Sequence, residues 1–310
     1  MANDPVFKLF AYVLVALIIA TVGGGIFRHR YGKTEAISNF QSRTYAWWVM
    51  VIVLALALIA GRGVMLVLYA AISAIALYEF AIPNRDRLIK DPVALAASGV
   101  IILFQYWLIW IDWYGLFSVF IPVYGFLFFP ILAVLTGKTE GFLSYISEMQ
   151  FGHMLAVFCL SHVPALLLLE IPGFAGRNIL LLAFLVLVVQ SSDVLQYLWG
   201  KALGRHKLAP SVSPSKTIEG LVGGIASACL IGVFFAWLTP FSRLEAFLIS
   251  FLVSSMGFFG GFVLSAIKRD RGVKDWGTLI PGHGGILDRI DSLLFAAPVY
   301  FHFIRYWWSV

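Results

Sequence analysis

The sequence contains few charged residues and almost no cysteine. Asp, Glu, Lys and Arg together make up only 12% of its 310 residues, against roughly 25% in an ordinary soluble domain. Charges this few could not cover the surface of a soluble chain of this length. The composition therefore excludes a soluble globular protein. The two cysteines, Cys159 and Cys229, lie inside apolar runs, and two are too few for a disulfide framework or a thiolate metal site.

Hydrophobic residues make up 61% of the chain, and the mean hydropathy is +0.91. A helix that crosses a membrane needs about 20 apolar residues. Runs of about this length occupy 6–27, 46–61, 63–82, 93–111, 113–136, 151–170, 178–199, 220–240, 244–267 and 290–308. We therefore predict an all-α integral membrane protein, a polytopic bundle of about ten transmembrane helices. The first run is too long for the apolar part of a signal peptide, so we interpret it as a retained span.

Basic residues alternate between the connections of these spans. Of the 22 Lys and Arg residues, 17 lie in the five connections 28–45, 83–92, 137–150, 200–219 and 268–289, and 3 lie in the four connections between them. Because basic loops stay in the cytoplasm, this side is predicted to be cytoplasmic and both termini to lie outside. We expect a bacterial inner membrane, because no organelle-targeting extension is visible. Topology thus explains the net charge of +6, and we expect no nucleic acid partner.

Several polar residues are expected to have structural roles. Glu79 lies near the end of a span, where interfacial water lowers the cost of a charge. Gly220 and Gly224, four residues apart, are expected to let two helices approach closely. The histidines, among them His162 and His302, show no spacing typical of metal ligands.

Asp193 is an exception because it lies well inside the apolar run 178–199. A carboxylate at that depth costs about 3 kcal/mol unless a partner or a cavity compensates. A structural interpretation is a buried hydrogen bond between helices through Ser191, Ser192 or Tyr197. We favour a functional role, as a ligand of a cation.

The segment 207–220 combines hydroxyl groups and a lysine just before the next span. The free N–H groups at a helix N-terminus bind anions, and Lys216 adds a mobile positive charge. Ser213 and Thr217 would either contact such an anion or cap the helix.

The strongest functional pattern lies in 265–291. Its basic cluster contains Lys268, Arg269, Arg271 and Lys274. Its glycines, Gly282, Gly284 and Gly285, allow the backbone to wrap around a ligand and present N–H groups to phosphate. Asp288 and Asp291 stand three apart at the start of a helix and share one face. Carboxylates beside a phosphate-binding loop suit Mg²⁺, so the segment predicts phosphoryl or nucleotidyl transfer onto a lipid.

The same segment reads S-x-x-K-R-x4-K-D-x-G-x2-I-P-G-H-G-G-x-x-D-R-x-D from Ser265 to Asp291. Upstream are D-x3-Y at Asp193 and Tyr197, and S-P-x-K-T-x-E-G from Ser213 to Gly220. Together these residues resemble the signature of the phosphatidate cytidylyltransferases, or CDP-diacylglycerol synthases. The resemblance is strong over about 190–300 and amounts to hydropathy alone before that.

The resemblance implies that CTP reacts with phosphatidate, or with a similar phospholipid acid, to give CDP-diacylglycerol and pyrophosphate. It implies Mg²⁺ as the cofactor and leaves open whether a second cation binds. It implies that Asp288 and Asp291 bind metal, with Asp193 beside them, and that Lys268 and Lys216 join the two aspartates in catalysis. The expected substrate-binding residues are Ser213, Thr217, Ser265, Arg269, Lys274, Asp275, Gly282, His283, Gly284, Gly285 and Arg289. A homodimer is left open.

One departure from the family pattern bears on the metal. Family members usually have acidic residues four and one positions before the signature serine, where this chain has Gly261 and Leu264. The expected site therefore has fewer carboxylates, for which Asp193 or Asp275 could substitute.

Two other functions stay open: a CTP-dependent lipid kinase of the polyprenol type, and a non-catalytic membrane scaffold or transporter. We divide the chain into N-terminal transmembrane helices, 1–170, and a catalytic transmembrane region, 171–310, with its active site on the cytoplasmic side.

Overall fold

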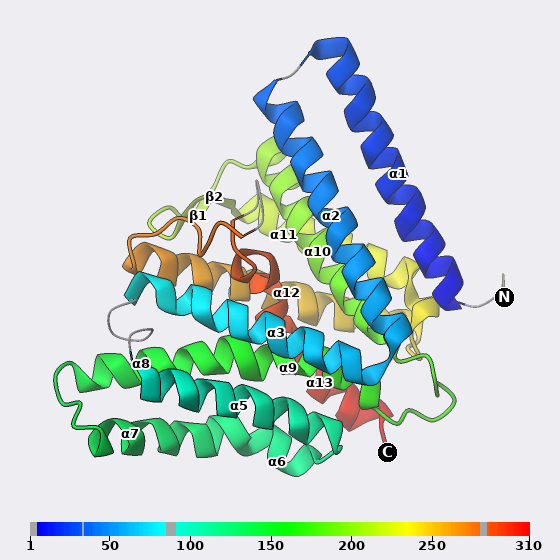
Figure 1. Cartoon of the computed structure of the whole chain (residues 1–310). Helices are drawn as coiled ribbons and strands as arrows, with labels where there is room; N and C mark the ends of the chain where they lie inside the picture. Colours follow the sequence, from blue (N-terminus) through cyan, green and yellow to red (C-terminus); the bar gives the residue numbers. More distant parts are fainter. Residues whose placement is uncertain (1–4, 33, 85–90, 280–283) are drawn as a thin grey trace.

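The computed structural model describes residues 5–32, 34–84, 91–279 and 284–310. It confirms the all-α polytopic architecture (Figure 1). Within the described residues, eight helices are long and apolar enough to cross a membrane. The two remaining predicted spans, 220–240 and 290–308, are helical as well, although the helix in the first has only 17 residues.

The N-terminal part begins with three long helices, α1 (Pro5–Tyr31), α2 (Glu35–Ala60) and α3 (Arg62–Ala81), followed by the short turn η1 (Ile82–Asn84) and α5 (Pro92–Trp110). The next two spans each contain a π-helical segment. One consists of α6 (Tyr114–Val119), η2 (Phe120–Gly125) and α7 (Phe126–Leu135), and the other of α8 (Phe142–His153), η3 (Met154–Cys159), α9 (Leu160–Ala165) and η4 (Leu166–Leu168).

The C-terminal part contains four long helices and a small hairpin. Its elements are α10 (Ile179–Leu203), β1 (Lys207–Ala209), β2 (Ser213–Thr217), α11 (Ile218–Phe234), η5 (Ala236–Leu238), α12 (Arg243–Asp270) and α13 (Leu287–Trp308). The antiparallel pairing of β1 with β2 places Lys207 opposite Thr217. The sequence analysis did not anticipate this hairpin, which fixes the residues before α11 in place.

Local sequence features explain where several helices begin. Asp91 caps α5 by accepting the N–H groups of Val93 and Ala94, and Pro92 occupies a first-turn position that needs no N–H. Gly61 ends α2 and begins α3 with φ +96°, a conformation that favours glycine. The short predicted connection at 61–63 is therefore a real turn between two spans.

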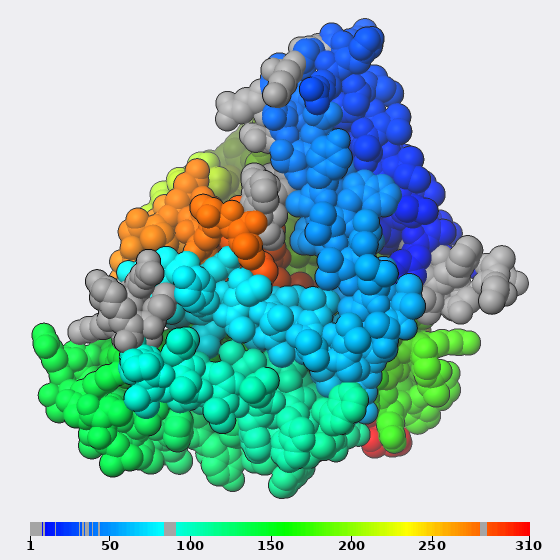
Figure 2. All heavy atoms as spheres, in the orientation of Figure 1, coloured from blue at the N-terminus to red at the C-terminus, as the bar shows by residue number. Residues whose placement is uncertain are grey.

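The helices α10 to α13 pack against one another and form a compact unit. A Cβ added at Gly224 would lie 2.2 Å from Cγ of Gln196, and one at Gly220 would lie 2.7 Å from the Gln196 carbonyl oxygen. These two glycines therefore allow the close approach of α10 and α11 that their spacing predicted. In contrast, α1 and α2 project from the body as a helical pair (Figure 2).

Three of the five predicted cytoplasmic connections, 83–92, 137–150 and 268–289, contact one another at one end of the bundle. Lys138 forms an ion pair with Asp91, and Tyr145 donates a hydrogen bond to Asp91 at 2.8 Å. Arg271 pairs with Glu148 at 3.1 Å, which joins the loop after α12 to α8. Side chains from both halves therefore meet at this end, and the domain division at residue 170 stays a prediction.

Candidate active site

A cavity of about 610 Å³ opens between α10, the hairpin, α11, α12 and the start of α13. Asp193 and Asp291 supply the carboxylates in its wall. Lys201, Lys207 and Lys216 supply positive charge. This volume lies in the range of small-molecule sites, and a wall with both signs of charge suits an anionic ligand bound together with a cation.

The two carboxylates meet through Ser292. The Ser292 hydroxyl donates to Oδ2 of Asp193 at 2.6 Å and lies 3.4 Å from Oδ1 of Asp291. The Ser292 N–H also donates to this Asp291 oxygen at 2.8 Å. The partner of Asp193 is thus on α13. The structural interpretation of Asp193, a buried hydrogen bond between helices, is confirmed, but the partner is Ser292 rather than Ser191, Ser192 or Tyr197.

This arrangement fits a divalent cation. Two carboxylates this close to a common hydroxyl repel each other unless positive charge lies between or beside them. Within the described ranges, no group of three or more His, Cys, Asp or Glu side chains is placed to hold a metal ion. A site with two carboxylates matches Mg²⁺, which keeps waters and takes further oxygen ligands from substrate phosphates.

Lys216 approaches the same carboxylates from β2. Its ammonium group lies 4.5 Å from the centre of the Phe258 ring on α12. Burial lowers the pKa of Lys216 below its ordinary value, and the negative charges of Asp193 and Asp291 oppose this shift. The lysine is thus a partly desolvated cation in the cavity wall. This position agrees with the prediction that Lys216 supplies positive charge to an anion-binding site in 207–220.

Asp288 lies in different surroundings from Asp291, although only one helical turn separates them. Its Oδ1 accepts the Lys268 ammonium at 2.9 Å. Its Oδ2 accepts the N–H groups of Trp276 at 2.8 Å and Gly285 at 3.0 Å. Asp288 is buried and is not part of the cavity wall. The N–H of Gly285 is therefore occupied by a side chain rather than free for a phosphate, and metal binding by Asp288 stays a prediction.

Two more predicted residues do line the cavity. Thr217 caps α11 by accepting the Gly220 N–H at 3.1 Å, so the capping interpretation of this residue is confirmed. Ser265 donates to the Gly261 carbonyl at 2.7 Å. The hydroxyl groups of both residues therefore have protein partners and also border the cavity.

The other predicted binding residues that the structure describes lie outside the cavity wall. Ser213 is buried in β2, and Gly284 has φ +79° beside Asp288. Arg269 donates to the Val212 carbonyl at 3.4 Å. Lys274 and Asp275 are exposed in the loop after α12, and Gly282 and His283 lie outside the described residues. Arg289 has a buried Nε without a hydrogen-bond partner in the described part of the chain.

Gly261 lies next to the carboxylate pair. It is part of the cavity wall, and a Cβ at this position would be 3.4 Å from Oδ2 of Asp291. A side chain here would point at Asp291 and Ser292, so the departure from the family pattern falls beside the carboxylate pair. Leu264, the second departure, is fully buried and not part of the cavity wall.

The expectation for Glu79 is wrong. Only 3% of this residue is exposed, so interfacial water does not solvate it. Instead its carboxylate accepts the N–H groups of Ile286 at 3.0 Å and Leu287 at 2.8 Å, more than 200 positions away. The sequence carries no signal for this contact, because nothing in a hydropathy profile says which loop faces a span end.

A separate polar cluster lies at the other end of α13. His162 and His302 meet through their Nε2 atoms at 3.2 Å, and the Tyr114 hydroxyl lies 3.2 Å from Nδ1 of His302. Sequence spacing gave no sign of this pair. Because Nδ1 of His162 lies 2.7 Å from the Phe158 carbonyl, it donates there, and its Nε2 must accept from His302.

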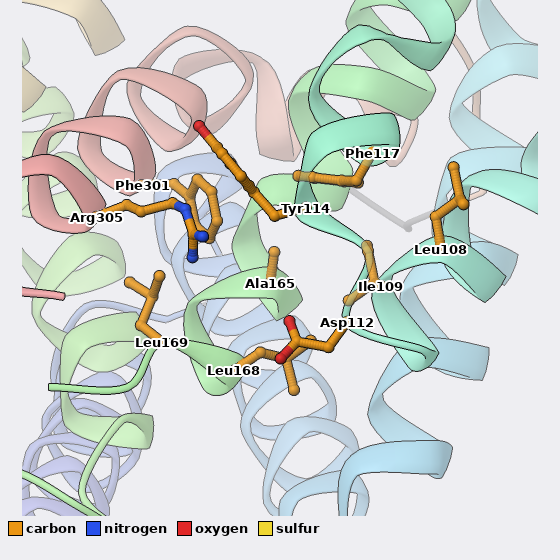
Figure 3. Close-up of a pocket in the computed structure, with 10 residues that line it drawn as sticks. All are labelled: Leu108, Ile109, Asp112, Tyr114, Phe117, Ala165, Leu168, Leu169, Phe301 and Arg305. Carbon is orange, nitrogen blue, oxygen red and sulfur yellow. The ribbon is translucent and has the colours of Figure 1, made fainter. Parts of the chain in front are cut away.

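A small cavity of about 20 Å³ adjoins this cluster. Figure 3 shows the Arg305 guanidinium group beside the Tyr114 ring, among mostly apolar side chains; the guanidinium carbon lies 3.7 Å from the ring centre. The cavity has room for about one water molecule, not for a nucleotide. Its Arg305 also lies about 25 Å along α13 from Asp288, because an α-helix rises about 1.5 Å per residue.

Comparison with known proteins agrees with the geometry. The model of the cytidylyltransferase family matches residues 41–307. A protein named uncharacterized protein YnbB, from Escherichia coli strain K12, is 38% identical over 310 residues, which cover 96% of this chain and 98% of that protein.

Several relatives carry the name phosphatidate cytidylyltransferase. The one from Staphylococcus aureus strain COL is 32% identical over 260 residues, covering 81% of this chain and 94% of that protein. The one from Synechocystis is 41% identical over 131 residues, covering 42% of this chain and 44% of that protein. The fold and the site define an integral membrane protein with a charged cavity among its last four long helices. The chain belongs to the cytidylyltransferase family.

Proposed function

We propose that this protein transfers CMP from CTP to phosphatidate, or to a similar phospholipid acid, and releases pyrophosphate. The observation that carries the proposal is the cavity in which Asp193, Asp291 and Lys216 meet, in a chain of this family. Relatives named phosphatidate cytidylyltransferase support the choice of phosphatidate as acceptor.

The cavity residues divide the work between charge neutralisation and positioning. A phosphate oxygen of the lipid attacks the α-phosphorus of CTP, the bond from this phosphorus to the bridging oxygen breaks, and pyrophosphate leaves. Lys216, Lys201 and Lys207 line the same cavity and would neutralise the triphosphate and the lipid phosphate. No protein nucleophile is required, because holding two bound substrates in line supplies much of the rate enhancement.

Asp193 and Asp291 would hold Mg²⁺, with Ser292 fixing both carboxylates. When bound, the cation would withdraw negative charge from the phosphates of CTP. The apolar part of the wall, which includes Phe258 and Leu221, would face the lipid. We further propose that the cavity opens to the cytoplasmic side of a bacterial inner membrane, because 17 Lys and Arg residues lie in the connections on its side.

The test uses purified full-length protein in detergent with phosphatidate, Mg²⁺ and CTP. CTP is labelled on the α-phosphorus in one reaction and on the γ-phosphorus in a parallel one. We expect only the α label to enter the lipid phase, and EDTA to abolish its transfer.

Other labelling patterns would contradict the proposal. Transfer of the γ label to a polyprenol or another alcohol would identify a lipid kinase. If neither label enters any phospholipid acid, while a relative named phosphatidate cytidylyltransferase is active in the same assay, the protein does not have this activity.

A further inference from the structure

Glu79 joins the N-terminal helices to the start of α13. It lies on the last turns of α3, and its two carboxylate oxygens accept one N–H each, from Ile286 and Leu287. These N–H groups belong to the turn where α13 begins and have no partner within the helix. A negative charge there also interacts favourably with the helix dipole. The contact therefore fixes where α13 starts.

Two glycines allow the loop to close around this carboxylate. A Cβ added at Gly277 would lie 2.7 Å from Oε1 of Glu79, and one added at Gly285 would lie 2.4 Å from Oε2. Real Cβ atoms do not approach this closely, so any larger residue would displace either the carboxylate or the loop. The backbone on both sides of the carboxylate is thus shaped to fit Glu79.

The same loop holds Asp288. Trp276, the residue before Gly277, and Gly285 itself donate their N–H groups to Oδ2 of Asp288. The Trp276 ring also stacks on Phe80, the residue after Glu79, with ring centres 5.4 Å apart. The end of α3 therefore holds the loop at two adjacent points, and the loop and the first turn of α13 together carry Asp288 and, one turn on, Asp291.

We propose that Glu79 is a positioning residue of the active site. It touches neither the cavity nor Asp291, and acts by fixing the first turn of α13, on which the reactive carboxylate depends. The expected effect of Glu79 on turnover rests on the proposed function, whereas its expected effect on the loop does not. It places part of the active-site machinery on α3, in the half of the chain that the sequence analysis treated as transmembrane scaffold.

The first experiment replaces Glu79 by Gln. The glutamine amide has nearly the same shape, but only one of its two polar atoms accepts a hydrogen bond, so one N–H of α13 loses its partner. We expect kcat to fall about 10- to 100-fold, as when residues that support metal ligands are removed, and the Mg²⁺ concentration for half-maximal activity to rise. Hydrogen exchange of a peptide covering 284–290, measured by mass spectrometry, should become about tenfold faster.

The matched control is Glu140→Gln, which changes an exposed glutamate in the loop before α8. It should leave turnover, Mg²⁺ dependence and exchange of 284–290 unchanged. Exchange of a peptide within α10 should be the same in all variants, because a general loss of folding would increase it.

A second variant tests the contact from the other side. The nearest atoms to a Cβ at Gly277 all belong to Glu79. Gly277→Ala should therefore lower kcat about tenfold in the wild-type background. In a Glu79→Ala background, which removes the obstructing carboxylate, the same change should have less than about a twofold effect, because changes at contacting residues are not additive.

Three results would overturn the proposal: Glu79→Gln with kcat within twofold of wild type, exchange of 284–290 that does not change, or additive effects of Gly277→Ala and Glu79→Ala. Exchange is measured without substrate. If the wild-type protein transfers no CMP but Glu79→Gln still accelerates exchange of 284–290, the proposed function fails and the anchoring role of Glu79 stands.

Discussion

Asp288 and Asp291 stand one helical turn apart in one sequence motif, yet the regions around them differ. The region of Asp288 is a closed loop, in which Lys268 and the N–H groups of Trp276 and Gly285 occupy both carboxylate oxygens. The region of Asp291 is the cavity, where the only hydrogen bonds to the carboxylate from described residues come from Ser292. A motif of two carboxylates thus combines one residue that organises the backbone with one that faces the cavity.

The largest expected effect is on the cavity side of this comparison. Asp291→Asn should lower CMP transfer about a thousandfold, because it removes the charge that would bind Mg²⁺ beside the reacting phosphates. Label transfer from α-labelled CTP measures the loss, and the elution volume in detergent checks the fold. Near-normal turnover would refute the metal assignment.

The loop side should respond through stability. Asp288→Asn leaves the Lys268 ammonium, on a side chain that is only 15% exposed, without its counter-charge, so the free energy of unfolding should fall by about 3 kcal/mol. Unfolding by SDS in mixed micelles measures this change. Asp270→Asn, at an aspartate whose side chain is 83% exposed, is the control and should have almost no effect. If Asp288→Asn is as stable as this control, the two regions do not differ as described.

A third prediction adds a carboxylate where this chain has none. Gly261→Asp would direct its side chain at Oδ2 of Asp291, so we expect it to supply a further oxygen ligand. The Mg²⁺ concentration for half-maximal activity should then fall about tenfold. An unchanged Mg²⁺ titration would show that position 261 does not face the ion. Gly257→Asp, four residues earlier on α12, is a comparison that should not lower the Mg²⁺ requirement.

The smallest effect is expected at the hydroxyl between the two carboxylates. Ser292→Ala removes the hydrogen bond to Asp193 but keeps the N–H that Asp291 accepts. The loss of one such bond is worth about 1 kcal/mol, so turnover should fall roughly fivefold. Steady-state kinetics with Ser292→Thr, which keeps a hydroxyl, should show at least partial recovery. A Ser292→Ala enzyme as impaired as Asp291→Asn would instead make Ser292 essential to the reaction.

Much of the fold followed from hydropathy. Each of the ten predicted spans contains a helix, because long apolar segments in a membrane can satisfy their backbone hydrogen bonds only internally. The hairpin of β1 and β2 was not predicted, since its strands of three and five residues carry no apolar alternation. The α1–α2 pair is as hydrophobic as the other spans, so hydropathy could not show that it projects from the body.

The site was predictable in kind but not in detail. Asp193, Lys216 and Asp291 lie around one cavity. The sequence had marked all three as candidates, through the depth of Asp193 in an apolar run, the charge of Lys216 before a span and the spacing of Asp291 from Asp288. The roles of Ser292 and Glu79 could not be predicted, because each contacts a residue far away in the sequence. Glu79 is the one charged residue of the predicted span 63–82, but nothing in that span identifies the loop that it contacts.

The sequence by itself determined that the chain is an integral membrane protein, where its helical spans lie, and which polar residues are too costly to bury without a partner. These properties depend on composition and on order along the chain, since transfer of each segment into lipid is a local free energy. The tertiary structure alone decided which carboxylate faces the cavity and which one holds the loop. That choice depends on which N–H groups, ammonium groups and hydroxyls lie within about 3 Å of each oxygen, and residues far apart in the chain supply several of them.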